Sequence, residues 1–312
     1  MIQYDGILLC KKPFGISSHE VINRLRQIIG QKKIGHTGTL DPRATGLLVI
    51  CLGRATKVAQ FLEDMDKAYE VEIKLGVSSS TFDAEGVTDD TQARPVPELT
   101  KKQVIETLSK FKGKIKQKVP AYSAAKVNGR RLYKLARLGH EVETPEREVD
   151  IKDIALTELD LPFIRCLVSC SKGTYIRSLA NDVGERIGCG AYLSKLSRTR
   201  VGSFVLTEAL SLNEIRHYRE AGVLKRHIKP IESILRFPSL KVTEDFSRWI
   251  VAGRSPRLKD IANVSGDFGP DDLISLKDHT GRIMAVGRAV VGSGELRDDE
   301  NKNFFTYVRV FN

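Results

Sequence analysis

The sequence predicts an α+β protein with a small β-rich domain at its C-terminal end. Three observations favour this class. Apolar residues recur at helical spacing in 17–30 and 175–187, and they alternate strictly with polar residues in AYEVEIKLG (68–76). Residues 239–312 contain short strand-like runs and turns, such as GRIMAVGRAVV and FFTYVRVF. Helices mixed with strands that look antiparallel are typical of an α+β body.

The first predicted helix spans residues 17–30. Its start, SSHE, has the spacing of a capping box, and Gly30 can end it. Its inward face is formed by Val21, Ile22, Leu25, Ile28 and Ile29. The segment IGHTGTLDPRATG (34–46) is a loop by composition, and LLVICLG (47–53) resembles a buried strand. Residues 57–65 resume a helical pattern.

The alternation in 68–76 predicts a half-buried strand with one apolar side. That side consists of Tyr69, Val71, Ile73 and Leu75. Thr100 begins a second predicted helix, which Gly113 ends. The inward residues of this helix are Val104, Ile105, Leu108 and Phe111.

The next predicted strand is PFIRCLVSC (162–170), which the turn SKGT connects to a third helix. The apolar stripe of that helix is Ile176, Leu179, Ala180, Val183 and Ile187. Tyr175 and Arg177 fall off this stripe, in the first turn. Taken alone, an arginine in a first helical turn would usually be a solvated charge.

A helical stretch near 212–235 precedes a break at FPSL (237–240). We therefore expect one domain of residues 1–237 and a smaller domain of residues 238–312. From residue 239 onwards, eleven basic residues balance eleven acidic ones. The charge of the whole chain therefore lies in the larger domain.

The net charge is +11, and its excess is concentrated in one segment. Between Lys101 and His140 there are twelve Lys/Arg and one Glu. Phosphate affinity comes from counterion release at clustered cations, so this clustering favours RNA as a partner. A merely solvated charged face is the alternative. Within a predicted excursion at about 114–150, the short helix RRLYKLARLG would carry Arg130, Lys134 and Arg137 on one basic face.

Nothing in the sequence indicates secretion, membrane insertion or a metal. No signal peptide is readable at the start, and the apolar run LLVICL is far too short to span a bilayer. The five cysteines form no CxxC pair, and the six histidines show no metal-ligand spacing. We expect a cytoplasmic protein with reduced, mostly buried thiols and without a disulfide framework or metal.

The loop around Asp41 is the main candidate for a functional site. An Asp-Pro pair alone is common at a helix start. However, GHTGTLDPRATG places three glycines, three threonines and one histidine around this carboxylate. Glycine permits close approach of a ligand to the backbone, and loops held by rigid elements commonly carry function. We expect this loop to present Asp41 to a substrate.

Five segments carry further motifs, in this order: KKPFGISSHEVINRLR, IGHTGTLDPRATGLL, DKAYEVEIKLG, VPAYSAAKVNGRRLYKLARLG and CSKGTYIRSLANDVGERIGCGAYLSKL. Together they resemble the successive motifs of the TruB family, the tRNA pseudouridine-55 synthases. The resemblance implies the pseudouridine-synthase fold, a mixed and largely antiparallel sheet with flanking helices and loops, followed by a domain similar to PUA. It also implies that the protein isomerises uridine in the T-arm loop of tRNA and uses no cofactor or metal.

The resemblance further assigns site residues. Asp41 corresponds to the catalytic aspartate, and Tyr175 and Arg177 to an active-site Tyr-x-Arg whose arginine pairs with it. The implied substrate contacts are His36 for the flipped uridine, Tyr69 stacked on uracil, Leu196 as an apolar contact, and Lys12. The basic residues Arg130, Lys134 and Arg137 would bind RNA phosphates.

These residue types suit the chemistry. Isomerisation breaks a C–N bond and makes a C–C bond with the same uracil, and a nucleophilic carboxylate divides this into easier steps. Addition to the ribose and initiation of elimination both stay open. Burial would raise the pKa of Asp41, and Arg177 would oppose that shift. A stacked uridine must first be flipped out.

The expected partner is the T-arm stem-loop of tRNA, bound by a monomer that needs no protein partner. Two alternatives stay open. One is an RNA-binding or tRNA-folding protein without turnover. The other is a guide-RNA-dependent pseudouridine synthase that acts on ribosomal RNA.

Replacing Arg130, Lys134 and Arg137 together by alanine should weaken RNA binding and flatten its salt dependence. Each lost phosphate contact removes roughly 0.9 from the slope of log K against log salt. Filter binding at several salt concentrations measures both effects. An unchanged slope would contradict the electrostatic role of the arm.

Overall fold

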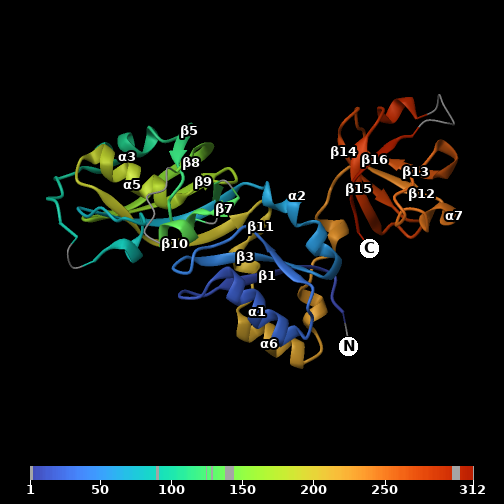
Figure 1. Ribbon diagram of the computed structural model, residues 1–312, viewed down its shortest axis with the longest axis horizontal. Helices are drawn as coiled ribbons and strands as arrows, with labels where there is room; N and C mark the ends of the chain where they lie inside the picture. Colours follow the sequence, from blue (N-terminus) through green and yellow to red (C-terminus); the bar gives the residue numbers. More distant parts are fainter. Residues whose placement is uncertain are drawn as a thin grey trace.

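The computed structural model describes residues 3–88, 91–123, 125–127, 129–137, 144–296 and 303–311. Nine strands of these residues form one large sheet (Figure 1). They are β1 (Gly6–Lys12), β2 (Ile34–Thr37), β3 (Thr45–Leu52), β4 (Lys67–Leu75), β5 (Gly113–Lys118), β8 (Glu146–Asp160), β9 (Phe163–Cys170), β10 (Ala191–Val201) and β11 (Phe204–Val205).

The main path of this sheet is β1-β3-β10-β4-β9-β8-β5, with β2 paired to β3 and β11 paired to β10. Only the short contact between β10 and β3 is parallel among these described pairs. The predicted mixed, largely antiparallel sheet is therefore confirmed. The parallel contact lies at Thr45 and Gly46, where β3 leaves the loop that carries Asp41.

Helices cover different parts of the sheet (Figure 1). They are α1 (Ser18–Ile29), α2 (Ala59–Glu63), α3 (Lys101–Ser109), α4 (Leu132–Arg137), α5 (Ile176–Ile187), α6 (Leu212–Glu220) and α7 (Glu244–Ser247). Short 3-10 turns add η1 (Gly53–Lys57), η2 (Ala84–Gly86), η3 (Leu206–Glu208), η4 (Leu224–His227), η5 (Ile231–Ser233), η6 (Leu258–Asp260) and η7 (Ser293–Glu295). The α3 and α5 helices pack beside β4, β8, β9 and β10, whereas α1 and α6 pack beside β1 and β3.

The strand β3 is buried on both faces, which explains its continuous apolar run. Leu47, Val49 and Cys51 join one core cluster with α2 and residues near 231–237. The alternate residues of the same strand, Leu48, Ile50 and Leu52, join a second cluster with α1. A strand covered on both sides loses the polar alternation of a half-buried one.

Local signals located the main helices and strands correctly. Ser17 caps α1 by accepting a hydrogen bond from the Glu20 amide at 3.0 Å, and Gly30 ends it in the left-handed conformation. The Glu20 carboxylate pairs with Arg24 instead of closing the capping box. Thr100 does form a complete box with Gln103 at the start of α3. The strand β4 and the helix α5 also lie where the sequence predicts.

Three local predictions were wrong. Residues 34–37 form β2 instead of loop, because they pair antiparallel with β3 and bury Ile34 and Thr37. The α3 helix ends at Ser109, and Gly113 opens β5 instead of ending the helix. Ile105 was predicted to face inward but is 52% exposed. Of the predicted inward face, only Val104 and Leu108 are fully buried.

The basic arm differs from the predicted helix RRLYKLARLG. Arg130 lies in β7 (Arg130–Arg131), which pairs with β6 (Lys126–Val127), so it is not part of the helix. Lys134 and Arg137 lie on α4, but their side chains fall outside the described residues, as does the end of the predicted helix. The buried Leu132 anchors the start of α4. A single basic helical face through all three cations was therefore a wrong prediction.

The C-terminal part forms a separate five-stranded sheet among its described residues (Figure 1). Its order is β13-β12-β14-β15-β16, from β12 (Ser239–Val242), β13 (Ile261–Ser265), β14 (Leu273–Lys277), β15 (Ile283–Ala289) and β16 (Phe305–Val310). Ile283, Val286 and Phe311 pack into the core cluster of the main body. The predicted β-rich part is confirmed, and the boundary at residue 237 stays a prediction.

All five cysteines are free and buried, as expected. Among the described residues, no helix is long and apolar enough to cross a membrane.

Candidate active site

Asp41 lies on a short loop between β2 and β3, and α1 fixes that loop. The Ser18 hydroxyl donates to the Leu40 carbonyl and accepts from the Leu40 amide, both at 2.9 Å. The Leu40 side chain is buried in the core. After Asp41 the chain makes a turn, closed by the Ala44 amide donating to the Asp41 carbonyl, and enters β3. The backbone at Asp41 is therefore held from both sides.

Lys12 holds the same loop from behind. Its ammonium donates to the carbonyls of Pro13 at 3.0 Å, Pro42 at 3.1 Å and Ala44 at 2.6 Å. The residue is 1% exposed, and burial lowers the pKa of the ammonium to about 8. An ammonium has three donors, and these carbonyls use all of them. The structure thus gives Lys12 a task in shaping the loop, and its predicted contact with substrate stays a prediction.

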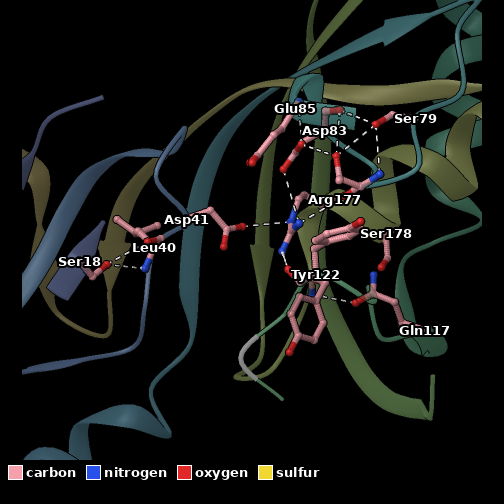
Figure 2. A network of polar contacts seen from close by, with 12 residues as sticks. Ser18, Leu40, Asp41, Ser79, Asp83, Glu85, Gln117, Tyr122, Arg177 and Ser178 are labelled. Carbon is pink, nitrogen blue, oxygen red and sulfur yellow. Dashed lines mark hydrogen bonds and ion pairs between the residues drawn. The ribbon is translucent and has the colours of Figure 1, made fainter. Parts of the chain in front are cut away.

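Arg177, in the first turn of α5, points its side chain toward Asp41 (Figure 2). Its Nε lies 3.0 Å from Oδ2 of Asp41. The other guanidinium nitrogens donate to the carbonyl of Thr81 at 3.3 Å and that of Tyr122 at 2.9 Å, and Nη1 lies 3.5 Å from Oδ2 of Asp83. The Arg177 side chain is 6% exposed, so these partners fix its plane and direct Nε at Asp41.

Asp83 is a site residue that sequence reasoning missed. It caps η2 by accepting from the Glu85 amide at 2.9 Å, and it accepts from the Thr81 hydroxyl at 2.6 Å (Figure 2). A polar cap of this kind is readable in SSSTFDAEG, but only as a local turn. Nothing in the spacing connects it to Arg177, because the contact forms between distant segments.

The surroundings of Asp41 raise its pKa. Desolvation by the surrounding protein is the largest cause, and the negative charge of Asp83 adds to it. Arg177 and Lys12 act in the opposite direction but do not cancel the effect. The side chain still keeps 42% of its surface open, so the carboxylate is partly desolvated and accessible at once. That combination strengthens a carboxylate as a nucleophile or base.

Asp41 and Arg177 line a first cavity of about 700 Å³. Tyr69, Tyr175 and Leu196 line it as well. Tyr69 is 7% exposed, and burial raises the pKa of its phenol, although a hydrogen bond from Arg198 opposes the shift. Cations at this cavity include Lys67, Arg147, Lys172 and Arg198. The cavity thus combines apolar walls with charged groups of both signs, since Glu63, Asp64 and Glu148 line it besides Asp41.

Arg198 is a second residue that sequence reasoning missed. It is 1% exposed, and it donates to the carbonyl of Leu47 at 2.8 Å and that of Gly38 at 3.0 Å. It therefore connects β10 to the loop before Asp41 and to the start of β3. In the sequence, SRTRVG reads as an ordinary polar strand end, which gives no hint of this burial.

A second cavity of about 1080 Å³ meets the first at the Asp41–Arg177 contact. His36, Thr39 and Ser123 also line both cavities. Burial lowers the pKa of His36, and the charges of Arg198 and His19 lower it further. The imidazole of His36 is therefore neutral at neutral pH.

The structure brings together most of the predicted site. Asp41, Tyr175, Arg177, His36, Tyr69 and Leu196 all line the first cavity. Tyr175 receives its position from Gln117, whose side-chain oxygen accepts from the Tyr175 amide at 2.7 Å. Arg130 is exposed and lines neither of these two cavities. The contacts of the arm with RNA stay a prediction.

Two family models match consecutive parts of the chain. Residues 26–176 match the family model of the TruB family pseudouridylate synthase N-terminal domain, and residues 177–236 match the tRNA pseudouridylate synthase B C-terminal domain. A protein named tRNA pseudouridine synthase B from Clostridium kluyveri is 38% identical over 98% of this chain and 99% of its own length. One with that name from Staphylococcus aureus is 39% identical over 91% of this chain and 94% of its own length.

Solved structures show the same fold. A structure of an H/ACA RNP bound to a substrate RNA containing 2'-deoxyuridine has a TM-score of 0.74 at 23% identity, and the match covers 98% of this chain and 85% of that one. An archaeal box H/ACA sRNP Nop10-Cbf5 complex has a TM-score of 0.72 at 23% identity, covering 100% and 87%.

Replacing Asp83 by asparagine should lower the pKa of Asp41. The negative charge of Asp83 disfavours ionisation of its neighbour, so its removal favours the carboxylate. Asparagine keeps an oxygen that can accept from Thr81 and from the Glu85 amide, which preserves the turn. Carboxyl ¹³C NMR of Asp-labelled protein, assigned with Asp41→Asn, follows the titration.

The matched control is Asp64→Asn, which removes a carboxylate from the first cavity whose charge is not among the causes of the Asp41 shift. It should leave the Asp41 titration in place. A titration midpoint that stays fixed or rises in Asp83→Asn would contradict the electrostatic account.

Proposed function

The chain belongs to the TruB family of pseudouridylate synthases, and we propose that it isomerises the uridine at position 55 in the T-arm loop of tRNA. It is a tRNA pseudouridine synthase, as the curated relatives are named. The observation that carries the finer proposal is the 3.0 Å contact between Asp41 and Arg177 at the edge of the first cavity. Asp41 is proposed as the residue that breaks the glycosidic bond.

The first cavity suits a flipped uridine. Its volume of about 700 Å³ lies within the range of small-molecule sites. Tyr69 supplies an aromatic wall for the uracil, and Leu196 an apolar one. Tyr69 is buried, and the neighbouring charge of Arg198 opposes the rise of its phenol pKa. A detached uracil has to rotate without escaping, and such walls favour retention.

The chemistry needs one ionised carboxylate near the sugar and one group that moves a proton. Arg177 keeps Asp41 oriented through a charged hydrogen bond and opposes the rise of its pKa. Attack on C1′ of the ribose and removal of the C2′ proton to start elimination both need this carboxylate in ionised form. Tyr175 lines the same cavity, and we assign it the relay of the C5 proton after the new C–C bond has formed: its phenol oxygen accepts that proton while its own proton passes to solvent, from which N1 of the uracil takes up a proton.

The uridine must leave its stack, at a cost of a few kcal/mol. Loops of RNA present bases that are already partly splayed, which lowers that cost. Arg147 borders the cavity with an exposed side chain and can attract the phosphates beside the flipped nucleotide, whereas Lys67 and Lys172 are engaged by backbone carbonyls and by Asp64. The neutral His36 lies where the two cavities meet, and we assign it the support of the flipped conformation.

We also propose that the protein acts as a monomer in the cytoplasm and that it modifies tRNA without a guide RNA or a protein partner. The basic segment 101–140 supports direct contact with tRNA, since clustered cations on this chain can bind RNA phosphates themselves.

Replacing Asp41 by asparagine should abolish pseudouridine formation while tRNA binding is kept. Asparagine has nearly the same shape but cannot act as nucleophile or base. The assay uses unmodified tRNA transcript and purified protein alone, with carbodiimide treatment and primer extension to locate pseudouridine.

Asp153→Asn serves as the control, because Asp153 is an exposed residue that pairs with Lys112 away from both cavities. Normal product from Asp41→Asn would refute the role of Asp41. Absence of product with the wild-type protein on bare transcript would refute stand-alone action and favour a guide-dependent enzyme or a binder without turnover.

A further inference from the structure

The second cavity has an exposed aromatic side chain on its wall. Phe14 lies between β1 and α1 and is 59% exposed, the largest exposed fraction among the large hydrophobic side chains that the structure describes. Its ring lines the cavity together with Asp41 and Arg177. Leaving a phenylalanine ring in water forfeits about 2 kcal/mol of burial free energy. No packing role within the described chain accounts for its place here.

Arg43 completes a stacked pair with this ring. Its guanidinium carbon lies 5.4 Å from the Phe14 centroid, within the range of a cation–π contact. Among the described residues, the Arg43 side chain makes this cation–π contact but no ion pair or hydrogen bond. The guanidinium therefore keeps its donors available at the cavity.

The pair is fixed relative to the reactive carboxylate. Phe14 and Arg43 each adjoin a proline, Pro13 and Pro42, whose carbonyl accepts from the Lys12 ammonium. The Gly15 amide also donates to the Pro42 carbonyl at 2.9 Å. Movement of the backbone at Phe14 or at Arg43 would therefore disturb the Asp41 loop. Such coupling suits a surface that positions substrate.

We propose that Phe14 and Arg43 form a stacking platform for the nucleotide next to the target uridine in the RNA chain. The inference rests on the proposed function, in which the uridine fills the first cavity. Its neighbour is attached through one phosphodiester and so begins beside Asp41. The second cavity opens there, because His36, Thr39, Asp41, Ser123 and Arg177 line both cavities.

The chemistry of the cavity favours a base over a phosphate. Unpaired bases are bound by stacking on aromatic rings and on guanidinium planes, and the pair offers both. The carboxylates of Asp83 and Glu85 also line this cavity, and Glu85 extends from the same turn as Asp83 (Figure 2). Asp83 is already engaged by Arg177, whereas the exposed Glu85 carboxylate repels a bare anion and can accept hydrogen bonds from the N–H groups of a base.

The test combines protein variants with altered tRNA transcripts. Steady-state kcat and KM for pseudouridine formation are measured for wild type, Phe14→Ala, Phe14→Tyr and Arg43→Met. Each protein acts on unmodified transcript and on two transcripts with an abasic nucleotide, either 5′ or 3′ of the target uridine. Phe163→Ala is the matched control, because Phe163 also has a cation–π neighbour, Lys74 at 5.9 Å, but lines neither cavity.

The platform predicts that Phe14→Ala raises KM on the order of tenfold, since stacking on an aromatic ring contributes about 1–3 kcal/mol per base. Its kcat should stay within about twofold, because no reacting atom is touched. Phe14→Tyr should restore the wild-type KM, and Arg43→Met should raise it severalfold. One of the two abasic transcripts should raise the KM of wild type as much as Phe14→Ala does. The same transcript should not raise the KM of Phe14→Ala any further.

Two results would overturn the platform while leaving the proposed function intact. One is a KM for Phe14→Ala that equals that of Phe163→Ala. The other is that each abasic nucleotide, 5′ or 3′, raises the KM of Phe14→Ala by the same factor as the KM of wild type. Independent effects of this kind would mean that Phe14 contacts neither neighbouring base. Absence of turnover by wild type on unmodified transcript is a different result, and it refutes the proposed function itself.

Discussion

A buried guanidinium is the constraint on which the site depends. Taking the charge of Arg177 out of water costs several kcal/mol unless its donors are paired. Two backbone carbonyls and two carboxylates supply the partners, and they come from the loop of Asp41, the turn of Asp83 and the segment of Tyr122. Three distant parts of the chain must therefore converge before Arg177 can be buried. Their convergence also builds the cavity.

Two more buried cations extend this logic to the loop itself. Lys12 binds the backbone after Asp41, and Arg198 binds the backbone before it and at the start of β3. Gly46 fits between these supports, because a Cβ there would lie 2.4 Å from the Arg198 carbonyl oxygen. The loop is thus held by hydrogen bonds whose loss would leave charges and carbonyls unpaired. A rigid loop keeps Asp41 in one orientation at little entropic cost during catalysis.

Sequence patterns predicted what local physics controls. The cap at Ser17, the left-handed Gly30 and the alternation around Tyr69 depend on near neighbours, and the structure confirms each. The strand β2 was missed because its burial arises from pairing with β3. Arg130 was assigned to a helix from the spacing of the basic residues alone. That spacing does not reveal that its strand, β7, pairs with β6.

The site was predictable to the extent that a family motif encodes it. Asp41, Tyr175 and Arg177 followed from the resemblance, and the geometry places them at one cavity. Asp83 and Arg198 carry no motif that we recognised, because their partners lie on other strands and turns. Lys12 was predicted as a substrate contact, whereas the structure shows it buried and holding the loop. The burial of a lysine cannot be read from its neighbours in sequence.

The central claim is that Arg177 serves the chemical step by holding Asp41. The most direct measurement compares single-turnover rate constants and tRNA affinities of Arg177→Met and Arg177→Lys with wild type. The account predicts near-normal affinity in both variants, a chemical step slowed at least about 100-fold in Arg177→Met, and a smaller loss in Arg177→Lys, which keeps the charge. A normal chemical step together with weakened tRNA binding in Arg177→Met would contradict it.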